Sequence, residues 1–250
     1  MIAIITGASA GIGEATAHAL AEIGYDIIIT GRRKERLDEL QSEIESKYNV
    51  KALPLAFDVR NYEETKQALE GLPTEWSSVD VLVNNAGLAA GLEPVQEGKV
   101  DNWERMIDTN IKGLLYVTRT IAPGMIKRQK GHILNVGSIA GKEVYANGNV
   151  YCATKHAVDA LSRGMRLDMV HDGIKVTNIA PGLVETEFSL VRFDWDSDKA
   201  KNVYQGFVPL SGKDIADCIA FAVTRPAHVT IADMLIFPTA QGSATTIAKK

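Results

Sequence analysis

The chain of 250 residues, with 46% apolar and 23% charged residues, is long enough for one globular α/β domain with a substantial core. A net charge of −4 without a long basic run argues against nucleic-acid binding, and no apolar run approaches the ~20 residues of a membrane span. The first residues lack the pattern of a signal or transit peptide, and Cys152 and Cys218 suggest neither a disulfide framework nor a zinc cluster, so we expect a cytoplasmic protein.

Apolar segments typical of strands alternate with amphipathic segments typical of helices along the whole chain. This alternation predicts a single α/β domain over 1–250, with a doubly wound, seven-stranded parallel sheet and helices on both faces. Asp101 and Glu104 suggest a capped start for the fourth helix, and Gly173 is the expected end of the fifth. The predicted strands are 2–6, 26–30, 51–57, 79–84, 132–137, 174–180 and 233–237, and the predicted helices are 12–24, 33–48, 61–71, 101–128, 149–172 and 211–224.

A glycine-rich turn, Thr6-Gly7-Ala8-Ser9-Ala10-Gly11-Ile12-Gly13, joins the first predicted strand to the first helix. Such a turn followed by a helix N-terminus is a geometry that binds the pyrophosphate of a dinucleotide. Gly7 allows a tight turn with positive φ, and we expect Gly11 and Gly13 to let phosphate approach the backbone. Glycine-rich turns also occur in ordinary loops, so the turn alone leaves a purely structural role open.

The end of the second predicted strand reads Thr30-Gly31-Arg32-Arg33 and contains no carboxylate. Sites for NAD usually place an acidic residue there, where it binds the ribose 2′-hydroxyl. Arginines instead match a 2′-phosphate through charge-assisted, bidentate hydrogen bonds. The sequence therefore predicts NADP(H), the alternative being that Arg32 and Arg33 simply open a solvated helix.

Three side chains suited to carbonyl chemistry are expected at the same edge of the sheet. Ser138 follows the fifth strand, and Tyr151 and Lys155 are spaced i, i+4 on one face of helix 149–172. A hydroxyl, a phenol and an ammonium beside a dinucleotide suit the interconversion of an alcohol and a carbonyl. Singly, each has an ordinary structural explanation. We expect no metal, because the five histidines show no ligand-like spacing: His18, His132, His156, His171 and His228.

A long irregular segment near 182–208 interrupts the alternation after the sixth strand. Segments of this kind at the carboxyl ends of parallel strands usually form lids or binding loops. Arg192 in this substrate loop, with Tyr145 and Gln241 as neutral donors, suits a small anionic substrate. The alternative is that Arg192 pairs with a neighbouring aspartate on the surface, Asp194 or Asp196.

The order and spacing of these motifs resemble the short-chain dehydrogenase/reductase family over essentially the whole chain. The resemblance implies a Rossmann fold in which Tyr151 is the general acid and base and Lys155 binds the nicotinamide ribose. The Lys155 ammonium and the positive charge of the oxidised nicotinamide are expected to lower the pKa of Tyr151. Ser138 would bind the substrate oxygen, and Asn110 would hold a water in a proton relay. The matching residues are Thr6-Gly7-x-x-x-Gly11-x-Gly13, Asn84-Asn85-Ala86-Gly87, Asn110, Ser138, Tyr151-x-x-x-Lys155 and Pro181-Gly182.

The same resemblance implies which residues bind the cofactor. Asp58 and Val59 would contact the adenine, Pro181-Gly182 would pass the nicotinamide, and Thr186 would reach the carboxamide or the pyrophosphate. The full expected set is Gly7, Ser9, Gly11, Ile12, Gly13, Arg32, Arg33, Asp58, Val59, Asn85, Ala86, Gly87, Tyr151, Lys155, Pro181, Gly182, Val184 and Thr186.

Residues 149–155 and 181–193 resemble the branch of this family that acts on small 3-hydroxy acids. That branch includes serine dehydrogenases, malonic semialdehyde reductases and sulfoacetaldehyde reductases, and the sequence does not choose among them. Alternatives are a reductase of neutral ketones or aldehydes, a non-catalytic NADP sensor and a sugar-nucleotide epimerase. The resemblance also implies a homotetramer built through helices 101–128 and 149–172, although the sequence alone would permit a dimer.

Overall fold

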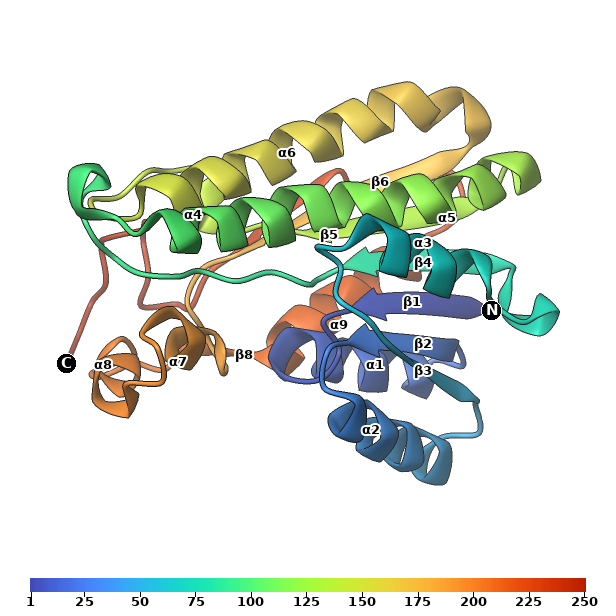
Figure 1. Ribbon diagram of the computed structural model, residues 1–250, viewed down its shortest axis with the longest axis horizontal. Helices are drawn as coiled ribbons and strands as arrows, with labels where there is room; N and C mark the ends of the chain where they lie inside the picture. The colour runs from blue at the N-terminus through green and yellow to red at the C-terminus, as the bar shows by residue number, and fades with distance from the viewer.

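Seven parallel strands form the central sheet of the computed structural model, which describes residues 1–250 (Figure 1). The strand order, β3-β2-β1-β4-β5-β6-β9, reverses direction at β1, as in a doubly wound Rossmann sheet. The predicted fold class is therefore confirmed. The strands are β1 (Ile2–Thr6), β2 (Asp26–Gly31), β3 (Ala52–Ala56), β4 (Val79–Asn84), β5 (Gly131–Val136), β6 (Ile174–Pro181) and β9 (Asp233–Ile236).

Helices cover both faces of this sheet (Figure 1). Along each strand, alternate side chains enter opposite cores: Ile5 and Ile29 pack with one helical layer, and Ile4 and Ile28 with the other. All four side chains are fully buried, which explains the continuous apolar runs. One layer contains α1 (Gly11–Glu22), α2 (Lys34–Lys47) and α9 (Gly212–Val223); the other contains α3 (Tyr62–Glu70), α4 (Val100–Ile107), α5 (Leu114–Arg128) and α6 (Asn149–Met169).

The predicted helix 101–128 is divided in the structure. A π-helical turn, Asp108–Gly113, separates α4 from α5 and carries Asn110 into the interior. The predicted Asp101 cap is wrong, because α4 starts at Val100 and its N-cap, Lys99, makes no side-chain capping bond. Gly173 does end the segment that follows α6, with a φ of 71° that favours glycine.

The substrate loop contains more regular structure than the sequence predicted. After β6, β7 (Val184–Glu185) pairs in parallel with β8 (Leu210–Ser211), and two short helices lie between them. These helices, α7 (Phe188–Arg192) and α8 (Ser197–Asn202), lie beyond the carboxyl ends of the strands (Figure 1). None of the helices in the structure combines the length and apolar character needed to cross a membrane.

Candidate active site

A cavity of about 490 Å³ opens at the carboxyl ends of the strands, between the glycine turn, the end of β5 and the substrate loop. Every residue expected to bind cofactor or substrate, or to carry out the chemistry, lines this cavity except Gly13 and Asn110. Strand ends from both halves of the sheet converge there, as expected at the reversal point of a doubly wound sheet.

The glycine turn adopts the backbone that its glycines permit. Gly7 and Gly11 have φ values of 66° and 61°, in the region that other residues rarely adopt. Gly13 does not line the cavity. Its missing side chain lets α1 start close against the glycine turn, because a Cβ there would lie 2.4 Å from the Gly7 carbonyl oxygen. Asn85 fixes the turn from the end of β4: its Nδ2 donates to the carbonyl oxygens of Thr6 (2.8 Å) and Gly7 (3.1 Å).

Arg32 and Arg33 line the cavity beside the glycine turn, just before α2 begins. Arg33 donates from Nε and Nη2 to the Ser9 hydroxyl at 3.2 and 3.0 Å, and from Nη1 to Glu187 at 2.9 Å. No hydrogen bond or ion pair occupies the Arg32 guanidinium. At the same edge, the carboxylate of Asp58 is held by Arg60 and Val59 is buried.

Tyr151 and Lys155 lie on one face of α6, and both side chains are buried beside the cavity. Lys155 Nζ donates to the Val136 carbonyl oxygen at 2.9 Å and lies 6.0 Å from the centre of the Tyr151 ring. Ser138 follows β5 and begins a short segment, residues 138–142, called the Ser138 segment. This segment packs closely on α6, since a Cβ on Gly141 would lie 2.5 Å from the Lys155 carbonyl oxygen. The three side chains predicted from spacing therefore share one wall of the cavity.

Burial controls the acidity of this group. Burial, with a smaller effect of Tyr145, raises the pKa of Tyr151, while the nearby Ser138 hydroxyl and Arg192 guanidinium oppose the rise. Burial also lowers the pKa of Lys155 to about 8. The net shift of the Tyr151 pKa is upward, because burial outweighs the opposing effects of Ser138 and Arg192. The lowering expected from Lys155 together with the oxidised nicotinamide stays a prediction. The upward shift favours the protonated phenol, which is the form that a proton donor needs.

Asn110 lies behind the cavity wall. Its Oδ1 accepts from the Leu88 amide at 2.9 Å, and its Nδ2 donates to the Leu88 carbonyl (2.9 Å) and the Thr154 hydroxyl (3.0 Å). These bonds fasten the segment after β4 to α6. The relay water expected from the resemblance stays a prediction.

Arg192 projects from α7 into the cavity. Its Nη2 donates to the Tyr145 hydroxyl at 2.9 Å, and its guanidinium carbon lies 5.5 Å from the centre of the Tyr151 ring. It forms an ion pair with neither Asp194 nor Asp196, so the alternative of a surface pair is wrong.

Gln241 lines the cavity, but its amide already has protein partners. Its Oε1 accepts from the Leu183 amide at 2.8 Å, and its Nε2 donates to the Ser243 carbonyl at 3.1 Å. The side chain is buried and supports the turn after Pro181, where a Cβ on Gly182 would lie 2.3 Å from Gln241 Oε1. Gln241 therefore supports the substrate loop, and because its Nε2 carries a second N–H, its role as a donor to the substrate stays a prediction.

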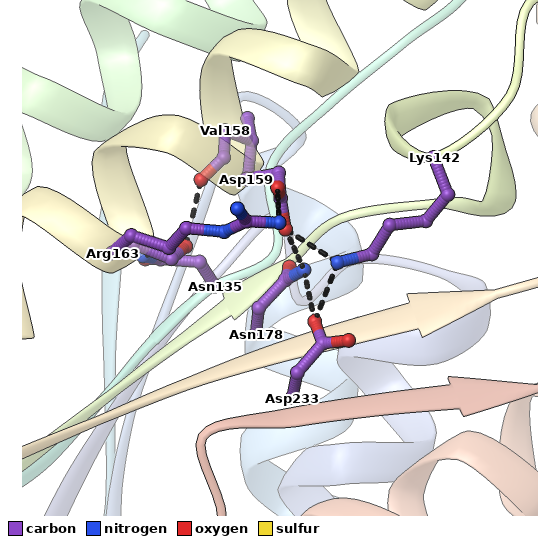
Figure 2. Close-up of polar contacts among 8 residues, drawn as sticks. Asn135, Lys142, Val158, Asp159, Arg163, Asn178 and Asp233 are labelled. Atoms are coloured by element: carbon purple, nitrogen blue, oxygen red, sulfur yellow. Dashed lines mark hydrogen bonds and ion pairs between the residues drawn. The ribbon is translucent and has the colours of Figure 1, made fainter.

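A cluster of charged and amide side chains, the Lys142 cluster, ties the Ser138 segment to three other elements (Figure 2). Lys142 Nζ binds Asp159 of α6 and, at 2.9 Å, Asp233 of β9. Asn178 of β6 donates to the same two carboxylates at 3.1 and 2.7 Å, and Arg163 binds the other oxygen of Asp159. The sequence motifs did not reveal this cluster, because its members are distant along the chain.

The site fits a dinucleotide with a 2′-phosphate. A Cβ would lie 2.9 Å from Ala86 Cα at Gly7 and 3.1 Å from Thr186 Cβ at Gly11, so this part of the wall is bare backbone at a helix N-terminus. The unpaired Arg32 guanidinium provides a cation at the edge where the ribose 2′-position is expected. Together with a buried phenol and lysine, this arrangement defines a dinucleotide-dependent oxidoreductase.

Comparison with known proteins specifies the family. The family described as "short chain dehydrogenase" matches residues 1–197, and the chain belongs to this family. It is 46% identical over 245 residues to the NADP-dependent 3-hydroxy acid dehydrogenase YdfG of Escherichia coli K12, covering 98% of this chain and 97% of that one. It is 45% identical over 248 residues to the NADP-dependent 3-hydroxy acid dehydrogenase of Schizosaccharomyces pombe, covering 99% and 96%.

Solved structures give the same result. The closed form of a serine dehydrogenase complexed with NADP+ superimposes with a TM-score of 0.93 at 46% identity, covering 98% of this chain and 97% of that chain. A serine dehydrogenase from Escherichia coli superimposes with a TM-score of 0.83 at 42% identity, covering 97% and 100%.

Proposed function

We propose that the protein uses NADP(H) to interconvert an alcohol and a carbonyl on a small anionic substrate. The substrate class is a 3-hydroxy acid or its semialdehyde, such as serine, 3-hydroxypropionate or malonic semialdehyde, or the sulfonate pair isethionate and sulfoacetaldehyde. The observation that carries the substrate class is Arg192: a guanidinium without a carboxylate partner, 5.5 Å from the Tyr151 ring, in the cavity wall. Relatives named as NADP-dependent 3-hydroxy acid dehydrogenases support the same class.

The glycine turn, Ser9, Arg32 and Arg33 would hold the pyrophosphate and the 2′-phosphate, and Lys155 would hold the nicotinamide ribose. When bound, NADPH supplies hydride to the carbonyl carbon, and NADP+ accepts it in reverse. Solved relatives with NADP bound support this cofactor.

The chain's own residues supply orientation and the proton. Arg192 and the Tyr145 hydroxyl would grip the anionic head of the substrate. Ser138 would donate a hydrogen bond to the carbonyl oxygen, and Tyr151 would donate its phenolic proton to that oxygen as negative charge develops. In the oxidative direction Tyr151 would accept the same proton from the alcohol.

A substrate panel tests this proposal. Malonic semialdehyde and sulfoacetaldehyde are compared with propanal for NADPH oxidation, and 3-hydroxypropionate, serine and isethionate are compared for NADP+ reduction. We expect higher kcat/KM for the anionic aldehydes than for propanal, because only they engage Arg192. Preference for bulky neutral ketones would instead favour the neutral-carbonyl alternative, and absence of turnover with every compound would favour an NADP sensor.

We also propose a homotetramer built through α5 and α6. Leu115 on α5 and Leu167 on α6 are exposed apolar side chains on these helices, with 36% and 75% of their surface accessible. Apolar side chains at these positions suit a contact between subunits. Sedimentation equilibrium of the protein tests this assembly. The cytoplasmic location remains a proposal, supported by two unpaired cysteines, Cys152 and Cys218.

A further inference from the structure

Glu187 lies where the substrate loop meets the arginines of the predicted 2′-phosphate site. Its Oε2 accepts from Arg33 Nη1 at 2.9 Å, and its Oε1 accepts from Arg36 Nη1 at 2.6 Å. Glu187 immediately precedes α7, the helix that carries Arg192. One carboxylate therefore joins the start of α2 to the part of the loop that would hold the substrate.

The two arginines at the end of β2 are consequently not equivalent. Arg33 directs Nε and Nη2 at Ser9 and Nη1 at Glu187, so its guanidinium is occupied by protein partners. Arg32 lines the cavity without such a partner. A phosphate could bind Arg32 directly, but full use of Arg33 requires an exchange of partners.

We propose that Glu187 competes with the 2′-phosphate of NADP(H) for Arg33, and that Arg36 retains Glu187 after the exchange. The inference rests on the proposed use of NADP(H). A carboxylate and a phosphate repel each other, so Glu187 weakens binding of the phosphorylated cofactor but not of NAD+. Glu187 thereby limits the discrimination between NADP(H) and NAD(H).

Calorimetric titration of NADP+ and NAD+ into the wild-type protein and Glu187→Gln tests the competition. Glutamine keeps the size of the side chain and removes its charge. We expect NADP+ to bind about two- to tenfold more tightly to Glu187→Gln, with a smaller gain at high salt, because a half-exposed ion pair has modest, screened strength. NAD+ binding stays unchanged. Glu185→Gln is the matched control, since it removes an exposed carboxylate of the same loop that has no arginine partner.

Weaker NADP+ binding to Glu187→Gln would show that Glu187 orients Arg33 for the phosphate, and would overturn the competition. Equal tightening of NAD+ would overturn it as well, because NAD+ has no 2′-phosphate. If the wild-type protein prefers NADP+ but Glu187→Gln changes neither affinity, the competition is overturned and the proposed function is left intact. A wild-type protein that binds both cofactors equally contradicts the proposed cofactor itself.

Arg36→Gln in the wild-type and Glu187→Gln backgrounds tests the second part of the proposal. If Arg36 acts only by retaining Glu187, its loss weakens NADP+ binding in the wild-type protein and has no effect once Glu187 is neutral. Equal weakening in both backgrounds would mean that Arg36 contacts the phosphate itself, and would overturn the retention role.

Discussion

Tyr151 combines burial, a raised pKa and a place beside Ser138 on the cavity wall. Tyr151→Phe removes the proton that the carbonyl oxygen must receive, so we expect turnover to fall by about 10²–10⁴-fold. NADPH binding should persist, because the ring can still pack against Phe188, whose ring centre lies 5.6 Å away. Stopped-flow turnover and NADPH fluorescence separate the two effects. The control is Tyr48→Phe, which removes a hydroxyl at the far end of α2. If Tyr151→Phe keeps more than a tenth of the wild-type activity, Tyr151 is not the general acid.

Arg192 is the residue that we expect to favour anionic over neutral substrates. Arg192→Ala should raise KM for malonic semialdehyde by about 10- to 150-fold, the range for a lost hydrogen bond to a charged group. The KM for propanal should change little, because propanal has no anion to bind. Steady-state kinetics on both aldehydes measure this difference. Equal losses on both would show that Arg192 supports the cavity through Tyr145 rather than selecting an anion.

At the residue scale, the sequence predicted side chains whose roles follow from local geometry. Tyr151 and Lys155 share a face because their spacing matches a helical turn. Gln241 was predicted only as a donor to the substrate, since only the fold shows that its amide oxygen also holds the turn at Leu183. Glu187 was missed for a related reason: its partner Arg33 lies 154 positions away, and no local pattern signals such a pair.

At the scale of elements, the Lys142 cluster holds the Ser138 segment against α6 (Figure 2). Lys142→Met should lower kcat roughly tenfold with little change in KM, since a displacement of about 1 Å at a reacting group can cost up to about a hundredfold. The loss should disappear in a Ser138→Ala background, because Lys142 acts through Ser138. Steady-state kinetics of the single and double variants measure this coupling.

The control for this variant is Lys130→Met, which breaks an ion pair with Asp80 outside the cavity. A loss of kcat in Lys142→Met that persists undiminished without the Ser138 hydroxyl would mean a general loosening of the fold. In that case the Lys142 cluster would stabilise the protein without positioning the serine.

The sequence predicted the long strands and helices better than the irregular turn inside one helix and the short helices of the substrate loop. Continuous apolar runs gave the parallel strands, because a strand buried on both faces has no polar side to alternate. The π-helical turn around Asn110 has no such signature, since it arises where the side chain bonds with Leu88. In the substrate loop, α7 and α8 are too short to show a helical period.

For the whole molecule, the alternation of strands and helices was enough to predict the doubly wound sheet, because right-handed connections leave few topologies. The NADP prediction also agrees with relatives named as NADP-dependent. The alternation does not show which titratable groups the core buries. One of them is a histidine on β5.

His132 on β5 lies opposite Lys175 of β6, and its Nε2 is 2.7 Å from the Thr177 hydroxyl. That hydroxyl donates to the Ile231 carbonyl, so it must accept from His132, and Nδ1 has no partner. Burial, with a smaller effect of Lys175, lowers the pKa of His132 to about 3. An unfolded histidine has a pKa of about 6.5, so between these values the unfolded state binds one more proton than the folded state.

Stability should therefore fall as the pH drops from about 6.5 toward about 3, and the contribution of His132 should be complete above about 6.5. His132→Gln can still donate to Thr177 but cannot titrate, so its free energy of unfolding should depend less on pH in this window. The slope should decrease by up to about 1.4 kcal/mol per pH unit. Urea unfolding at a series of pH values measures the slope, with the exposed His228→Gln as control. Parallel curves for His132→Gln and the wild-type protein would mean that the core accepts a charged His132, and that another group sets the acid limit of the fold.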